Sequence, residues 1–317
     1  EAKRAGKRSV AETPSKMQQM RLDRTLAWNG IRLSIPGHWE ARVAAPCHLI
    51  FEAEFQPLLQ LRWYQQSSKA PAESQRLAAA LAKQGDMVEP KSAGSEKSNW
   101  TAPWRQLESK FQVLAFSAGR EKTPSGGAFS CPHCHTLVHF QTFPDKTMDT
   151  TGDIGTIGKT IAEALATISC HDHDEDLYRI QDFSLSLPPG FRLMDYSFAS
   201  GLTRLSFAAG QLRLTAARLA PADERLKHQS LAEILLAQTD VADLQIRDTG
   251  EENSCEGFRD PAIFRRLLLR LRRDRPFVRA RIGHDPLHNR LLSLILSGSR
   301  PLPAGLLPEI AATYAIV

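Results

Sequence analysis

A cluster of cysteine and histidine residues has the spacing best suited to chemistry in this sequence. The stretch "SCPHCHTLVHF", residues 130–140, places Cys131 and Cys134 three positions apart, with His135 directly after them. A C-x-x-C pair at a tight turn directs both sulfur atoms to one side, where they can bind a single tetrahedral metal ion. Because two ligands leave such a site incomplete, the other ligands must come from elsewhere in the chain.

The stretch "SCHDHD", which begins at residue 169, can supply these ligands. After the turn, a strand over 137–143 runs away for roughly 23 Å at about 3.3 Å per residue. A helix over 153–168 then returns for roughly 24 Å at about 1.5 Å per residue. We therefore predict a structural zinc site in which three thiolates and one imidazole favour zinc over calcium or magnesium. The predicted ligands are Cys131, Cys134, Cys170 and His173, with His171 and His135 as alternative metal ligands.

Other interpretations of the same residues stay open. Cys131, Cys134 and His135 spell C-x-x-C-H, the attachment motif of c-type haem, so haem c is the alternative cofactor. A redox dithiol is a further alternative, although C-x-x-C in that role normally opens a helix rather than a strand. The simplest alternative is a pair of thiols on a turn with no cofactor.

The common enzymatic motifs are absent from the sequence. There is no G-x-x-x-x-G-K-[ST] phosphate loop, no G-x-S-x-G nucleophile elbow and no H-E-x-x-H pair. The glycines of "GDIGTIGKT" have the wrong spacing for a phosphate loop. We therefore lean toward a protein without enzymatic activity and expect no small-molecule substrate.

The elements that must position the cluster follow a plan that occurs twice. The stretch "IRLSIPGHW" at 31–39 resembles "FSLSLPPGF" at 183–191, and in both an alternating apolar strand ends at proline and glycine. The likeness continues through further strands, a proline-led helix and a final helix. We predict an α+β fold of two tandem copies, 25–176 and 177–317, each an antiparallel sheet with helices packed on one face. The cysteines occur at this turn in the first copy alone, so only that copy is expected to hold the metal.

The opening phrases "IRLSIPGHW" and "FSLSLPPGF" make each half similar to the PsbP-like fold. Domains of that fold often begin with a short strand that runs into a proline, a glycine and an aromatic residue. The resemblance covers the strand order of each half. It implies an accessory or binding protein rather than an enzyme, and it carries over no catalytic residue.

The positive charge of the chain is concentrated in two segments. The formal net charge is +5, while residues 1–24 carry +4 and residues 259–290 carry +7. We expect 1–24 to be a basic flexible arm. Local basicity of this kind favours an anionic partner.

The second basic segment predicts an arginine face on a hairpin. In "FRRLLLRLRRDRPFVRARI" arginines alternate with apolar residues, and a hairpin would set Arg270 opposite Arg279. Arginine suits bidentate recognition of carboxylate or phosphate. We predict a protein partner with an acidic surface, with nucleic acid or internal ion pairs as alternatives. The arginine face comprises Arg266, Arg270, Arg272, Arg279 and Arg281.

These observations combine into one functional prediction. The sequence indicates a zinc-stabilised binding or assembly protein without enzymatic activity. The alternatives are a redox or c-type haem protein and a nucleic-acid-binding accessory protein. No apolar run approaches the roughly 18 residues of a membrane span. The odd number of cysteines, five, favours a reducing, cytoplasmic location.

Overall fold

The computed structural model describes residues 21–65, 86–88, 101–117, 126–143, 154–171, 174–239, 241, 243–248, 250, 253–263, 266 and 275–317. Of these residues, 50% lie in strands and 19% in helices, and the strands form three antiparallel sheets. The structure is therefore mostly β, and the predicted α+β class is wrong. The alternation of apolar and polar residues does correspond to strands, as at β2 (Ile31–Ile35) and β11 (Phe183–Leu187). Helices, however, occupy too little of the described chain to form a layer against each sheet.

The N-terminal sheet has seven strands in the order β3-β4-β5-β9-β8-β7-β6. Every neighbouring pair is antiparallel. The strands are β3 (Glu40–Ala45), β4 (His48–Ala53), β5 (Gln56–Gln65), β6 (Asp86–Val88), β7 (Gln112–Ser117), β8 (Gly126–Ser130) and β9 (Thr136–Thr142).

The C-terminal sheet also has seven strands, in the order β12-β13-β14-β18-β17-β16-β15. Numbered within each half, this strand order is the same as that of the N-terminal sheet. The strands are β12 (Arg192–Ala199), β13 (Leu202–Ala209), β14 (Leu212–Leu219), β15 (Gln245–Asp248), β16 (Ser254–Arg259), β17 (Phe277–Asp285) and β18 (Arg290–Gly298).

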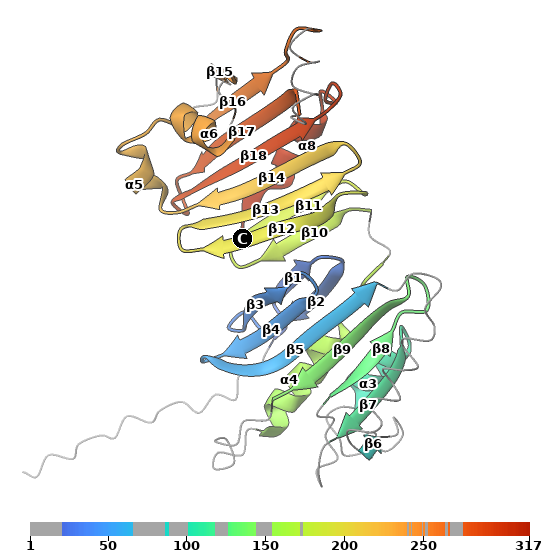
Figure 1. The fold of residues 1–317 in the computed structure, drawn as a ribbon. Coiled ribbons are helices and arrows are strands. Elements are labelled where there is room, and N and C mark those ends of the chain that lie inside the picture. The colour runs from blue at the N-terminus through green and yellow to red at the C-terminus, as the bar shows by residue number, and fades with distance from the viewer. Residues whose placement is uncertain are drawn as a thin grey trace, which may run out of the picture.

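A third sheet joins the two halves where they meet (Figure 1). It contains β1 (Arg24–Trp28), β2 (Ile31–Ile35), β10 (Asp176–Ile180), β11 (Phe183–Leu187) and β19 (Ala315–Ile316). Its order is β19-β11-β10-β1-β2, so a hairpin from each half lies beside the other. The opening strands thus leave their own sheets, which the alternation of apolar residues could not indicate.

Trp28 at the end of β1 packs the two halves together. Its side chain is fully buried, and its ring lies 5.8 Å from the ring of Tyr178, 5.5 Å from Tyr196 and 5.9 Å from Phe198. The β1–β2 turn that presents it is Asn29-Gly30, with φ of 44° and 88°. This left-handed pair suits a two-residue hairpin, because its twist matches that of the strands. One large hydrophobic core consequently runs through both halves.

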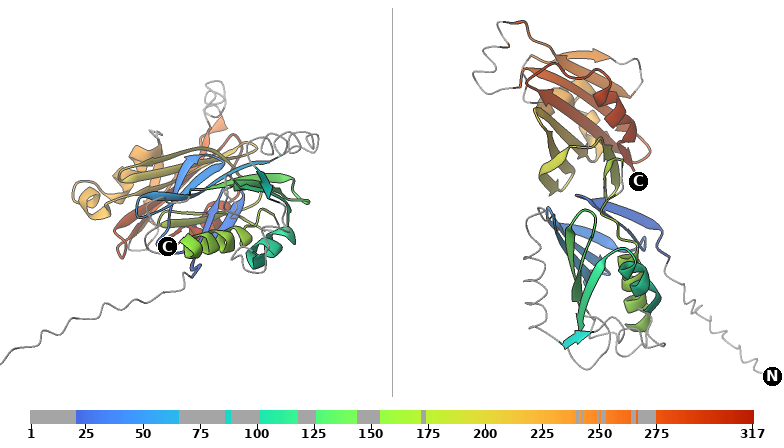
Figure 2. Two further views of the ribbon diagram at one scale, coloured as in Figure 1. Left: turned by 90° about the horizontal axis from the view of Figure 1, so that it is seen from below. Right: turned by 90° about the vertical axis from the view of Figure 1, so that its right-hand side faces the viewer.

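The helices lie on particular faces of the sheets. Helix α4 (Ile154–Ala166) packs beside α3 (Thr101–Glu108) on one face of the N-terminal sheet (Figure 2). Helix α8 (Leu306–Thr313) contacts β11, β17 and β18 on the core side of the C-terminal sheet, while α6 (Leu231–Thr239), preceded by α5 (Ala222–Leu226), contacts β16 and β17 on the opposite face. None of the described helices is long and apolar enough to cross a membrane.

Candidate metal centre

The hairpin of β8 and β9 presents the first two cysteines. Its turn is closed by backbone hydrogen bonds, from Cys131 N to the Thr136 carbonyl at 2.9 Å and from His135 N to the Cys131 carbonyl at 3.1 Å. His135 adopts a left-handed φ of 57°, which reverses the chain within a few residues. Cys131 and Cys134 therefore lie on the same side of a rigid turn, as the sequence predicts.

The segment that follows α4 brings the third cysteine to this turn. The helix ends at Ala166, and Ser169 then exchanges two 2.9 Å backbone hydrogen bonds with Arg32 of β2. Ile168, which lies between Ala166 and Ser169 in the sequence, is fully buried. This bridge fixes the chain direction, so that Cys170 and His171 face the β8–β9 turn. The predicted return of the chain to the turn is confirmed.

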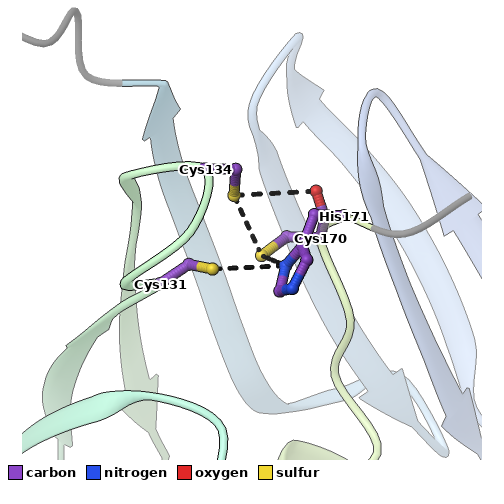
Figure 3. A group of neighbouring side chains, drawn as sticks. All are labelled: Cys131, Cys134, Cys170 and His171. Atoms are coloured by element: carbon purple, nitrogen blue, oxygen red, sulfur yellow. Dashed lines mark hydrogen bonds between the residues drawn. The ribbon is translucent and has the colours of Figure 1, made fainter.

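Four potential ligand atoms meet at this point (Figure 3). The Cys131 sulfur lies 3.2 Å from Nδ1 of His171, and the sulfur atoms of Cys134 and Cys170 lie 3.4 Å apart. The Cys170 sulfur is 3.6 Å from the same imidazole nitrogen. All four ligand atoms lie within 4.8 Å of one another. This Cys3His group can hold a metal ion.

Three of the spacings among these atoms are close to those of a tetrahedral coordination shell. Bonds of about 2.0 Å to nitrogen and about 2.3 Å to sulfur place the ligand atoms of a tetrahedral site about 3.6 Å apart. Cys131 is buried, while the other three residues are partly buried. A small hollow of about 110 Å³ borders Cys170 and His171 and reaches Arg32 and Asp176. The group is therefore enclosed on the turn side and accessible from one direction.

The thiols of the group influence one another. Burial raises the pKa of Cys134, but hydrogen bonds with Thr136, Cys170 and Cys131 outweigh burial and hold this pKa below its ordinary value. The pKa of Cys170 is raised well above its ordinary value, first by burial and then by Cys134 and Cys131. Crowded thiols resist ionising together, and a bound cation removes that resistance.

The structure separates the predicted histidine ligands. His171, predicted as an alternative, is the histidine in the group. His135 is exposed on the turn and lies outside the group, whereas His173 is outside the described residues. The ring of His133 lies 4.9 Å from that of His171, so His133 covers the imidazole rather than contributing a ligand atom.

Sequence reasoning missed Thr136, whose hydroxyl lies 3.1 Å from the Cys134 sulfur. The sequence feature that could have indicated Thr136 is its position directly after "CPHCH", because the first residue of the following strand lies beside the turn. Thr136 is buried, so its hydroxyl stays close to the thiol.

The predicted arginine face is not a hairpin of opposed arginines. Arg266 lies in a helical turn, its backbone N donating to the Ala262 carbonyl at 3.0 Å, whereas a strand was predicted here. Arg279 on β17 stands opposite Phe258 and Leu296 rather than Arg270. Arg270 and Arg272 lie outside the described residues.

The described arginines of this set also have partners within the chain. Arg266 pairs with Asp260 at 3.1 Å and lies over the Phe277 ring. Arg281 pairs with Glu256 at 3.4 Å. Arg279 lies over the ring of Phe258, 5.6 Å from its centroid. Internal contacts thus hold part of the predicted face.

Comparisons with known proteins give a limited result. No family model matches the chain, and the search of curated proteins finds no match. Among solved structures, the crystal structure of MucB shares 10% identity at a TM-score of 0.20, over 90% of this chain and 81% of that one. The crystal structure of MucB in complex with MucA(peri) matches at a TM-score of 0.18, and the Pseudomonas aeruginosa MucA/MucB complex at 0.19. These scores carry no argument about function, and the PsbP-like resemblance stays a prediction.

Proposed function

We propose that the protein is a binding or assembly protein without enzymatic activity, stabilised in its first half by a structural zinc ion. The observation that carries the proposal is the group Cys131, Cys134, Cys170 and His171, whose ligand atoms lie within 4.8 Å of one another. Three thiols and an imidazole form a soft ligand set, which favours zinc among the common biological divalent ions.

Such a zinc ion stabilises the fold rather than acting on a substrate. Four protein ligands complete a tetrahedral shell and leave no position for a reactive water molecule. The ion links the β8–β9 turn to the segment after α4, 36 residues beyond Cys134. Because this link exists in the folded chain alone, the free energy of metal binding adds to the free energy of folding.

The surroundings of Cys131 argue against the haem alternative. Haem attachment requires both cysteine sulfurs to reach the edge of a large flat ring. Cys131 is only 1% exposed, and its sulfur faces the imidazole of His171. A redox dithiol at Cys131 and Cys134 is also less favoured, because the close sulfur–sulfur contact, at 3.4 Å, joins Cys134 to Cys170.

The plan of two copies belongs to this proposal. Its support is that the two seven-stranded sheets share one strand order and that each half contributes one hairpin to the central sheet. A reducing, cytoplasmic location also belongs to it, since three adjacent thiols would otherwise oxidise.

The binding part of the proposal depends on positive charge in the second half and in the basic arm, residues 1–24. The charge of Arg213 lowers the pKa of Arg275, after burial as the larger cause, so the two cations lie close together. Arg281 borders a hollow of about 600 Å³ between the ends of β16–β18 and α8. Positive charge at these places in the second half favours an acidic protein partner, with nucleic acid as the alternative.

Metal analysis of the purified protein tests the zinc site. We expect one zinc ion per chain in the wild type and loss of zinc in Cys170→Ser. The matched control is Cys47→Ser, because Cys47 lies outside the group and its sulfur accepts a hydrogen bond from Asn29 that serine can also accept. Haem absorbance, or zinc retained by Cys170→Ser, contradicts the proposal.

Capture experiments test the binding part. The double variant Arg279→Ser, Arg281→Ser should keep its zinc and its fold and should capture less of the native partner than the wild type. If nuclease treatment abolishes capture by the wild type, the partner is nucleic acid. If capture is unchanged in the variant, these arginines serve the fold alone.

A further inference from the structure

A row of three basic residues crosses the outer face of the N-terminal sheet. His48 on β4 stands directly opposite Arg62 on β5, and Arg62 stands directly opposite His139 on β9. Directly paired residues project from the same face of a sheet. Their chain neighbours Leu49, Leu61, Trp63, Val138 and Phe140 are buried in the large core, so the row faces away from it.

Both histidines have a polar atom with unmet hydrogen-bonding capacity. Nε2 of His48 and Nε2 of His139 are buried, and within the described chain neither has a hydrogen-bond partner. Burial, followed by the charge of Arg62, lowers the pKa of each imidazole. The shared influence of Arg62 places its guanidinium close to both rings. A buried polar atom without a partner is costly unless a ligand or a water molecule meets it.

Arg62 at the centre of the row is exposed, and no carboxylate of a described residue forms an ion pair with it. When the Gln60 side-chain amide is placed with its oxygen toward Arg62, that oxygen accepts hydrogen bonds from Nε of Arg62 at 2.8 Å and from Nη2 at 3.1 Å. These contacts fix the direction of the guanidinium and leave its charge uncompensated. Glu52, an acidic residue on the same face of β4, pairs with Arg42 at 3.2 Å.

We propose that His48, Arg62 and His139 form a binding site for a phosphate group. The guanidinium supplies the positive charge and paired donors that suit phosphate oxygens. Each neutral imidazole donates from one nitrogen, and a phosphate group offers three acceptor oxygens for these three side chains. The ligand is inorganic phosphate or the phosphate group of an ester.

The second half has different residues at the corresponding positions, and α6 packs over them. On the outer face of the C-terminal sheet, Ala217, Ala280 and Ile282 are buried in a separate core beneath α6. Arg204 of β13, which stands opposite Ala217 on this face, donates to Gln238 of α6 at 3.3 Å, so α6 covers the basic side chain there. The phosphate site is also independent of the metal centre, so either proposal can fail without the other.

A titration of histidine ring signals by nuclear magnetic resonance tests the site on the intact, metal-loaded protein. Addition of inorganic phosphate should shift the ring signals of His48 and His139 together and saturably, while those of His228 and His288 in the second half stay constant. Phenyl phosphate should compete with inorganic phosphate if the natural ligand is an ester, and should bind more weakly if it is the free ion. If neither addition moves the two signals, water alone occupies the row and the proposal is wrong.

Variants then assign the donors. Arg62→Gln should weaken phosphate binding at least about tenfold, the usual effect of losing a charged hydrogen bond. The matched control is Arg192→Gln, which removes the same charge from an exposed strand position of the other sheet and should bind as the wild type does. Acetate should bind the wild type at least about tenfold more weakly than phosphate, because it offers two acceptor oxygens and less charge. Equal binding of acetate, or equal weakening by Arg192→Gln, means that the row senses charge alone and contradicts a phosphate site.

Discussion

The two halves share one strand order, yet they differ at two corresponding places. The first difference lies at one turn. In the first half, the turn between β8 and β9 carries Cys131 and Cys134, whereas the corresponding turn between β17 and β18 in the second half carries Asp285 and His288. There His288 donates to the Asp285 carboxylate from its backbone N at 3.2 Å and from Nδ1 at 2.8 Å. The turn is thus closed by side-chain hydrogen bonds in the second half, whereas in the first half it carries two cysteines of the Cys3His group.

The outer faces of the two sheets also differ, and again the polar side chains with a possible ligand lie in the first half. In the second half a hydrophobic core forms between this face and α6, with Ile234 and Leu235 buried. In the first half the central strands place His48, Arg62 and His139 on it. The second half is stabilised by a second hydrophobic core, while the first half combines a polar face with a candidate metal centre. The backbone plan therefore constrains side chains on the core side, and the outer face and the turns are left to vary.

Removal of the metal should have the largest effect and should separate the halves most clearly. If the site holds zinc, its removal by a chelator should destabilise the first half by about 5 kcal/mol where free zinc exceeds the Kd about ten-thousandfold. All five tryptophans lie within 25–176, so tryptophan fluorescence during urea unfolding reports this half. An unchanged midpoint after the metal is removed contradicts a stabilising ion.

The substitution Trp28→Ala should have the next largest effect, because it removes the side chain that joins the halves. The expected loss is about 3–5 kcal/mol, typical of a large buried aromatic. Separate unfolding transitions should then be seen by tryptophan fluorescence and by circular dichroism. If both probes still report one transition, contacts other than Trp28 couple the halves.

The substitution Gly257→Ala tests the packed outer face of the second half. An added Cβ would lie 2.4 Å from Cδ2 of Leu244, so the core beneath α6 must shift. We expect a loss of about 1–3 kcal/mol from overpacking, with zinc content unchanged. Gly283→Ala is the control, because the nearest atom to its added Cβ is the Asn253 carbonyl oxygen at 4.0 Å. Equal destabilisation by both variants contradicts a tightly packed outer face at Gly257.

The substitution Asp285→Asn should have the smallest effect. Partial burial raises the pKa of Asp285, but hydrogen bonds from His288 outweigh it, so the pKa lies below its ordinary value. A carboxylate with a depressed pKa stabilises the fold above its unfolded pKa, and this stabilisation is lost as pH falls through the folded pKa. The expected difference at pH 7 is below about 1 kcal/mol, because the pair is partly exposed. It should decrease as pH falls through the folded pKa, because Asp285 then becomes uncharged like asparagine; a difference that stays constant across the acid range excludes the ionised carboxylate as its cause. Urea unfolding followed as a function of pH measures it.

Much of the metal centre could be predicted from residue types and lengths. The strand that leaves the turn and the helix that returns have similar lengths, and this places Cys170 beside Cys131 and Cys134. The place of His171 in the group could not be predicted, because it depends on the bridge between Ser169 and Arg32, which orients the last residues before the site.

The predicted strand around Arg266 shows a limit of alternation. Leucine and arginine are good helix formers, and the segment lacks the β-branched residues that favour strands. A period of two was therefore insufficient, and Arg266 lies in a helical turn. The row of His48, Arg62 and His139 was missed because these residues lie far apart in the sequence. Only the register of the strands brings them together.

The sequence by itself determined the alternating strands, their turns and the clustering of soft ligands, because each depends on near neighbours along the chain. Only the tertiary structure decided which strands pair, how a hairpin from each half builds the central sheet, and which side chains share the outer face. Hydrogen bonding between strands is indifferent to side-chain identity, so partner and register are selected by packing of the whole core.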